Sequence, residues 1–131
     1  MHSTARLAII FGICALANAS GLVASAQVRV VKDLAYKPDA ATDYERERCK
    51  LDLYLPNRAA AFPTIVWFHG GGLQNGDKAR EIEVHAGQRF AENGIALASV
   101  NYRLHPQAHF PAYVEDAAAA VAFVISSKRP S

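Results

Sequence analysis

Cysteine is scarce in this sequence, and charge of one sign is never clustered. Two of the 131 residues are cysteine, and 14 Lys and Arg stand against 12 Asp and Glu, which gives a net charge of +2. Dedicated nucleic-acid-binding domains usually carry a clustered basic face, so the composition argues against a nucleic-acid partner. The densest charged stretch, residues 45–48, alternates in sign and is typical of a solvated surface.

Acidic residues are absent before Asp33, and residues 1–26 have the pattern of a secretory signal peptide. Arg6 gives a short positive region, residues 7–16 are almost wholly apolar, and residues 24–26 follow the small-x-small rule of signal peptidase. The apolar run is shorter than the ~20 residues of a stable membrane span. We therefore expect secretion or export to the periplasm, with cleavage after Ala26; the alternative is an uncleaved N-terminal anchor.

Removal of residues 1–26 leaves Cys49 as the one cysteine, so export does not imply an intrachain disulfide. Cys49 alternates with Leu51 and Leu53, a pattern that predicts a small, buried, hydrophobic side chain. Nothing in the sequence places a base beside its thiol, so we do not expect Cys49 to be a nucleophile.

The remaining sequence contains strand patterns of two kinds. Alternating residues predict an edge strand at 27–31 and a half-buried strand at 48–55, with a polar loop at 36–47 between them. Continuous apolar runs at 64–68 and 95–100 predict strands that are buried on both faces.

Apolar residues at spacings of three and four predict two helices. The first lies between the two buried strands and ends at Asn93 and Gly94, a C-terminal stop signal. The second begins near Pro111, which suits a first helical turn. The first apolar stripe consists of Ala79, Ile82, Ala86 and Phe90, and the second of Val114, Ala117, Ala118, Val121 and Ile125.

This order of elements predicts an α/β fold. Two buried strands joined by a helix form a right-handed parallel crossover, and the first two strands add antiparallel edge strands to the same sheet, with helices flanking it. The helix that ends near Ser127 should lead into another parallel strand. We therefore expect residues 27–131 to be one incomplete domain, the N-terminal part of such a fold.

The most informative motif is His69-Gly70-Gly71-Gly72, directly after the buried strand at 64–68. Consecutive glycines let the backbone turn sharply and expose N–H groups without obstruction by a Cβ atom. Exposed N–H groups at the end of a strand stabilise a developing oxyanion, so the motif predicts an oxyanion loop. The alternative is a flexible turn with no chemical role.

A phosphate-binding loop is a second interpretation of the same region. The spacing of Gly71, Gly76 and Lys78 approaches that motif. However, Asp77 would repel phosphate, and Ala79 stands where a Ser or Thr should hold the metal. We do not expect nucleotide binding.

A zinc site is equally unsupported. His105 and His109 have the spacing of two ligands on one helix face, but Pro106 between them disfavours a helix, and no third ligand is evident. The sequence therefore predicts neither a metal nor an organic cofactor.

Two segments resemble those of the α/β-hydrolase-fold esterase and lipase family, in its hormone-sensitive-lipase-like or feruloyl-esterase-like bacterial carboxylesterase branches. They are VWFHGGGLQNGDK at 66–78 and SVNYRLHPQAHFPAYVEDAAAAVAFV at 99–124. In that family a Tyr-Arg-Leu-x-Pro segment follows the fourth strand and leads into Phe-Pro-Ala and a helix with an early Asp. The matching residues here are Tyr102, Arg103, Leu104, Pro106, Phe110, Pro111, Ala112 and Asp116.

The resemblance implies hydrolysis of small-molecule carboxylic esters by a serine nucleophile, without a cofactor. The N–H groups of Gly71 and Gly72 would form the oxyanion hole, and His69 and Gly70 would shape its loop. Independently of the resemblance, Arg103 and Asp116 carry charge next to apolar runs, so we expect them to form a structural ion pair or a loop anchor and not to be catalytic. Neither the acyl and alcohol specificity nor the oligomeric state follows from these motifs.

The family's nucleophile lies in a G-x-S-x-G turn on the next strand, followed by an Asp or Glu and then a His. No serine here has glycine two residues before and after it. We therefore expect the chain to be truncated before the nucleophile, acid and base, and to be inactive alone. Two alternatives to an esterase remain: an inactive truncated fragment and a short, non-catalytic binding module.

Overall fold

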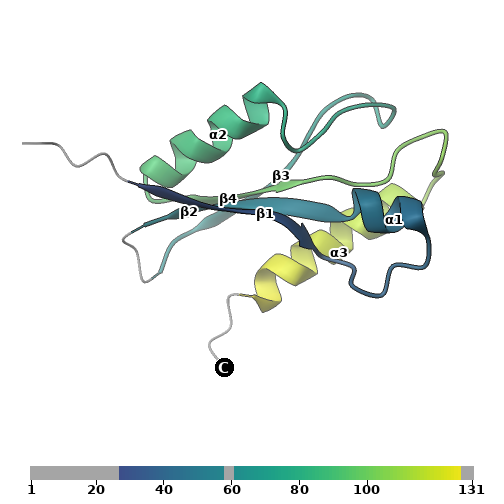
Figure 1. Cartoon of the computed structure of the whole chain (residues 1–131), viewed down its shortest axis with the longest axis horizontal. Helices are drawn as coiled ribbons and strands as arrows, with labels where there is room; N and C mark the ends of the chain where they lie inside the picture. Colours follow the sequence, from purple (N-terminus) through teal and green to yellow (C-terminus); the bar gives the residue numbers. More distant parts are fainter. Residues whose placement is uncertain (1–26, 58–60, 128–131) are drawn as a thin grey trace, which may run out of the picture.

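A computed structural model of the chain describes residues 27–57 and 61–127, which form a four-stranded mixed sheet with helices on both faces (Figure 1). The proposed signal peptide lies outside the described residues. The sheet order is β1-β2-β4-β3. In chain order the elements are β1 (Val28–Ala35), α1 (Asp43–Arg48), β2 (Lys50–Pro56), β3 (Thr64–Phe68), α2 (Glu81–Glu92), β4 (Ala96–Val100) and α3 (Ala112–Ser126).

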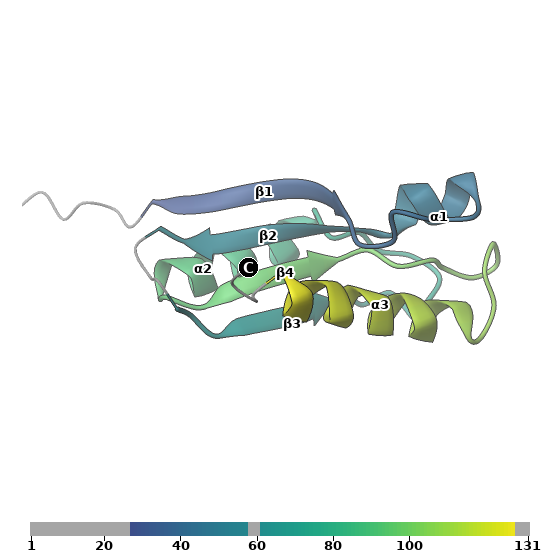
Figure 2. The same cartoon turned by 90° about the horizontal axis from the view of Figure 1, so that it is seen from below.

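The strand directions confirm the predicted fold class. Strand β2 runs antiparallel to both β1 and β4, whereas β3 and β4 are parallel and are connected through α2. Helix α2 covers one face of the sheet and α3 covers the other (Figures 1 and 2). None of the helices in the described ranges is long and apolar enough to cross a membrane.

The polar stretch at 36–47 is not only a loop, because it contains the start of α1. The Thr42 side chain accepts a hydrogen bond from the N–H of Glu45 at 3.1 Å and so caps the helix. Thr-x-x-Glu is the sequence signal of such a cap, and it was available in the sequence. The solvated surface predicted for 45–48 is wrong for two of its residues: Glu45 is buried, and the Arg48 side chain is only 13% exposed.

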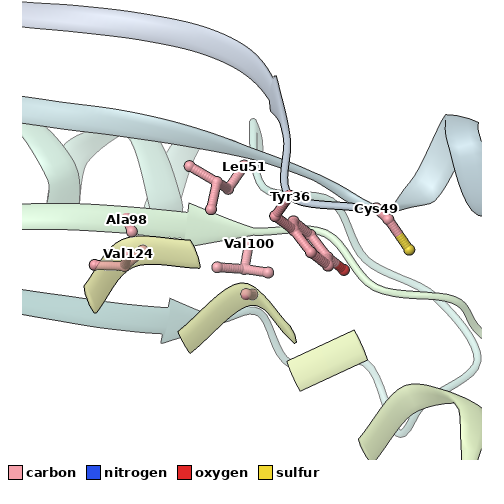
Figure 3. Close-up of a cluster of buried hydrophobic side chains, with 7 residues drawn as sticks. Tyr36, Cys49, Leu51, Ala98, Val100 and Val124 are labelled. Atoms are coloured by element: carbon pink, nitrogen blue, oxygen red, sulfur yellow. The ribbon is translucent and has the colours of Figure 1, made fainter. Parts of the chain in front are cut away.

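Strand β2 is covered on both faces, so the half-buried strand predicted at 48–55 is wrong. Leu51 packs with residues of α3 in one core cluster, which also contains Cys49 (Figure 3). Tyr54 points to the opposite face and packs beneath α2 in a second cluster. The alternating pattern gave the wrong prediction because Asp52 is charged and suggested a solvent-exposed face, whereas its side chain is buried.

Strand β4 is buried throughout, as predicted, whereas β3 is not. In the described part of the chain β3 pairs with β4 alone and forms an edge of the sheet. Its first four side chains are therefore half-buried, and Phe68 is exposed.

Helix α2 packs on the sheet through a face shifted from the predicted stripe. Its buried residues are Glu83, Gly87 and Ala91, with Ala86 and Phe90 packed beside them. Ile82, in the predicted stripe, is 66% exposed. A Cβ atom on Gly87 would lie 2.4 Å from the Tyr54 ring, so glycine is what lets the helix approach the sheet this closely.

Helix α3 also buries another face than the predicted one. Its buried residues are Asp116, Ala120 and Val124, whereas Val114, Val121 and Ile125 are exposed. The helix is apolar around most of its circumference, and a stripe cannot be located by periodicity in such a helix. Asp116, which pairs with Arg103, lies on the buried face.

Candidate active site

The HGGG motif forms a loop at the carboxyl end of β3, in front of α2. Gly71 has a φ of 133° and Gly76 a φ of 120°, both in the left-handed region that favours glycine. A Cβ atom on Gly71 would lie 1.9 Å from the Asn75 carbonyl oxygen, and one on Gly76 would lie 2.2 Å from Nδ1 of His69. The loop therefore closes on itself so tightly that both positions require glycine.

Two carbonyl groups of this loop are held by hydrogen-bond contacts within the loop. The oxygen of Gly70 lies 2.9 Å from Nδ1 of His69. The oxygen of Gly71 accepts from the N–H groups of Gln74 at 3.1 Å and Asn75 at 3.2 Å. In a trans peptide the carbonyl and the following N–H point in opposite directions. The N–H groups of Gly71 and Gly72 therefore point away from these anchors, and neither has an acceptor among the described residues.

His69 is buried and stacks on the ring of Tyr102, with centroids 4.6 Å apart. The Tyr102 hydroxyl donates to the His69 carbonyl at 2.7 Å and so ties the start of the loop to the segment that follows β4. Burial, together with the nearby charges of Arg48 and Arg80, lowers the pKa of His69 below its usual value. His69 is therefore neutral near pH 7 and is enclosed by the loop.

Arg48, at the end of α1, is part of the site although the sequence analysis did not identify it. Its guanidinium donates to the carbonyl oxygens of Tyr102 at 3.1 Å and Gly76 at 3.2 Å. It also lies 3.4 Å from Nε2 of His69 and from Asp77. Figure 2 shows how this is possible, because α1 and the loops after β3 and β4 gather at one end of the sheet.

Lys78 is buried beneath the loop, and its ammonium group is paired with two carboxylates. Its ammonium group donates to Asp52 at 2.7 Å and pairs with Asp33 at 2.9 Å. Its backbone N–H donates to the Asn101 side chain at 2.7 Å, and Asn101 in turn donates to Asp77 at 2.8 Å. These contacts connect the loop to β1, to β2 and to the residue that directly follows β4.

The expected ion pair between Arg103 and Asp116 is confirmed. Asp116 is fully buried and accepts from Nη2 of Arg103 at 2.7 Å, from its Nε at 2.9 Å and from its backbone N–H at 3.0 Å. Lys37 donates to the same carboxylate at 3.1 Å and also pairs with Glu45. The cluster fastens the segment after β4 to α1 and α3.

Glu45, Cys49 and Asp116 are close enough for a shared metal ion, but their chemistry does not suit one. Lys37 and Arg103 already neutralise the two carboxylates. Burial raises the pKa of the Cys49 thiol to about 11, which keeps it protonated, whereas a metal needs the thiolate. Cys49 is the buried hydrophobic residue that its alternation predicted.

The described serines lie in structural positions. Ser99 is buried in β4 and donates to the Lys78 carbonyl at 2.9 Å. Ser126 and Ser127, at the end of α3, both donate to the Phe123 carbonyl. His105 and His109 stack edge to face, with centroids 5.3 Å apart, and both are exposed.

An apolar pocket of about 320 Å³ lies beside the glycine loop. Two of its residues flank the motif itself, Phe68 before it and Leu73 after it. The others come from the segment after β4 and from α3, and the full lining is Phe68, Leu73, Tyr102, Tyr113, Val114 and Ala117.

The sequence is similar to proteins whose names include a methylesterase and a deacetylase-like protein. It is 37% identical over 84 residues to a probable isoprenylcysteine alpha-carbonyl methylesterase of Oryza sativa subsp. japonica, a match that covers 63% of this chain and 19% of that protein. It is 40% identical over 81 residues to arylacetamide deacetylase-like 2 of Homo sapiens, covering 58% and 20%. The chain thus spans about a fifth of the length of these curated relatives.

Solved structures agree with this similarity. Esterase B of Lactobacillus rhamnosis (HN001) superposes with a TM-score of 0.61 at 27% identity, over 74% of this chain and 29% of that one. The BD-FAE family model matches residues 51–129, a range that contains the glycine loop, the ion pair of Arg103 and helices α2 and α3. The chain therefore belongs to the BD-FAE family and has the N-terminal part of an α/β-hydrolase fold.

Proposed function

We propose that this chain contributes the oxyanion hole of a serine hydrolase that acts on carboxylic esters. The observation that carries the proposal is the pair of N–H groups of Gly71 and Gly72, which have no acceptor among the described residues while the carbonyl preceding each is anchored. Fixed donors of this kind stabilise the negative charge that develops on an ester carbonyl oxygen during nucleophilic attack. The names of the relatives, which include a methylesterase and a deacetylase, support the same chemistry.

In this mechanism the glycine loop binds the oxyanion, and the nucleophile belongs to another part of the protein. A serine outside the described residues would attack the ester carbon while a histidine takes its proton. The N–H groups of Gly71 and Gly72 would hold the resulting oxyanion. His69, which is neutral and enclosed, would fix the shape of the loop and would not contact the substrate. This chemistry needs neither a metal nor an organic cofactor.

We also propose that the protein is exported. The support is the sequence pattern of residues 1–26, with a positive start, an apolar centre and a small-x-small end. Ester hydrolysis would then take place in the periplasm or the medium.

The test of the oxyanion hole compares two glycines in the protein expressed from its complete reading frame. A Gly71→Ala variant would push a Cβ atom into the Asn75 carbonyl, and the loop would have to move. We expect kcat to fall by about 100-fold, the scale of losing one oxyanion donor. KM should change far less, because the contact forms mainly in the transition state.

The matched control is Gly94→Ala. Gly94 also has a positive φ, of 81°, but it follows Asn93, the C-cap of α2, and a Cβ atom there would meet nothing within 4 Å. This variant should lose stability and keep its kcat. A Gly71→Ala enzyme with normal kcat on a chromogenic short-chain ester would show that the loop is not the oxyanion hole.

A serine-reactive phosphonate separates the esterase from the two non-catalytic alternatives. The complete protein should be labelled at one serine, in a G-x-S-x-G turn downstream of α3, and the 131-residue chain should not be labelled. Stoichiometric labelling of a serine within residues 27–131 would show that the active site is elsewhere.

A further inference from the structure

Among the described residues, Arg48 is the one side chain of α1 that lies within hydrogen-bonding distance of the glycine loop at 69–76. We infer that it is a positioning residue, which holds His69 in the tautomer that keeps the N–H of Gly71 directed at the substrate. This inference rests on the proposed oxyanion role of the loop and adds a residue outside the motif.

The guanidinium joins three segments. It donates to the Tyr102 carbonyl at 3.1 Å on one side and to the Gly76 carbonyl at 3.2 Å on the other, and Nη2 lies 3.4 Å from Nε2 of His69. The side chain is 13% exposed, so few of these contacts are shared with water. A planar guanidinium with several fixed donors can satisfy such separated acceptors at once.

The contacts of His69 determine where its proton lies. An arginine side chain can only donate a hydrogen bond, so Nε2 of His69 must be the acceptor in its contact with Arg48. A carbonyl oxygen can only accept, so Nδ1, 2.9 Å from the Gly70 oxygen, must carry the hydrogen. Both contacts are favourable only in the neutral Nδ1–H tautomer.

The tautomer in turn fixes the orientation of one peptide group. The Gly70 carbonyl and the Gly71 N–H belong to the same planar unit and point in opposite directions. With Nδ1–H donating to the carbonyl, the N–H faces out of the loop. In the other tautomer two acceptors, Nδ1 and the Gly70 oxygen, would face each other, and rotation of the peptide to relieve this would turn the N–H of Gly71 away from the substrate.

Protonation of both ring nitrogens is disfavoured by the same surroundings. His69 is buried, and Arg48 and Arg80 add positive charge around it. The partly exposed Asp77 is the negative charge that opposes their effect on the pKa of His69. Arg80 also donates to the Gly70 oxygen, but at 3.4 Å and from the surface. Among the described residues, Arg48 is the one side chain with a hydrogen-bond contact to Nε2 of His69.

The experiment uses the protein expressed from its complete reading frame and two independent readouts. The first is the steady-state kcat and KM on a chromogenic short-chain ester. The second is the protonation of the His69 ring, read from nitrogen-15 chemical shifts in two-bond proton–nitrogen spectra of histidine-labelled protein. The variants are Arg48→Ala and Arg48→Lys, with Arg46→Ala as the matched control. Arg46 lies on the same helix, and within the described part of the chain its polar contacts are to Asp43 and the Ala40 carbonyl.

We expect Nδ1 of His69 to be protonated in the unmodified enzyme, and this preference to weaken in both Arg48 variants. Their kcat should fall by about 10-fold or more, below the full loss of an oxyanion donor, with KM within about threefold. Arg46→Ala should match the unmodified enzyme in both readouts. If Arg48→Ala does not fold, Arg48→Lys decides, because its single ammonium group keeps the charge and cannot reach the Tyr102, Gly76 and His69 acceptors at the same time.

A second test removes the choice of tautomer. In a His69→Asn background the amide nitrogen can occupy the place of Nδ1 and is always a donor. The loss of kcat caused by Arg48→Ala should therefore be smaller there than in the parent enzyme. Equal losses in the two backgrounds would overturn the inference and assign Arg48 a purely structural role.

The first test can also overturn the inference. It is wrong if Nε2 carries the proton in the unmodified enzyme, or if the Arg48 variants keep either the Nδ1–H tautomer or the full kcat. An enzyme without esterase activity would instead refute the proposed function, and the ring spectra would then still decide whether Arg48 sets the tautomer.

Discussion

Replacing Asp116 by asparagine should destabilise the domain more than any other single change to a carboxylate of α3. Asp116 is fully buried and accepts four hydrogen bonds, three from Arg103 and one from Lys37. Asparagine keeps one acceptor oxygen, and its amide group would face donors of Arg103. Breaking a buried ion pair costs about 3–5 kcal/mol. Because the side chains of Arg103 and Lys37 are 17% and 25% exposed, we expect the lower end, about 3 kcal/mol.

Urea denaturation at pH 7 measures this loss. With a slope of about 2 kcal/mol per M, a loss of about 3 kcal/mol lowers the midpoint by roughly 1.5 M. Glu115→Gln is the matched control, because Glu115 is the neighbouring carboxylate on the same helix and is exposed. It should change the free energy of unfolding by less than about 0.5 kcal/mol.

The acid dependence gives a second check. Burial alone would raise the pKa of Asp116, but the hydrogen bonds from Arg103 and Lys37 outweigh it and hold the pKa below the ordinary value of 3.8. The native carboxylate therefore contributes stability that is present above the unfolded-state pKa and is lost as the pH falls through the native one. The gap between unmodified protein and Asp116→Asn should narrow below about pH 4. A gap under about 1 kcal/mol at pH 7, or one unchanged at pH 3, would refute the argument.

Two further predictions concern other parts of the chain. A Gly87→Ala variant places a Cβ atom 2.4 Å from the Tyr54 ring. It should destabilise the protein by about 1–3 kcal/mol through overpacking, although alanine favours helices by about 1 kcal/mol over glycine. An unchanged urea-denaturation midpoint would mean that α2 can move away from the sheet without a loss of stability. N-terminal sequencing of the exported protein should begin at Gln27, and recovery of an intact Met1 from the exported fraction would disprove cleavage after Ala26.

Local patterns determined the parts of this protein that depend on neighbouring residues. The largely apolar run at 95–100 predicted β4, and Asn93 and Gly94 predicted the end of α2, because burial on both faces and a left-handed turn each leave a direct trace in the sequence. The three glycines after an apolar strand likewise located the candidate oxyanion loop. The charges of Arg103 and Asp116 beside apolar runs predicted a structural ion pair or a loop anchor, and the structure confirms the ion pair.

Tertiary structure alone decided which charged residues are inside. Hydrophobic periodicity assigns every charge to the surface, so it placed Glu45, Arg48 and Asp52 in solvent and chose the wrong faces of α2 and α3. Arg48 and Asp52 have partners that are distant in sequence: Arg48 contacts Tyr102, 54 positions away, and Asp52 contacts Lys78, 26 positions away. A buried charge is stable only when an opposite charge or a hydrogen-bonding group meets it. That meeting exists only after the sheet has brought α1, the loop after β3 and the segment after β4 to one end.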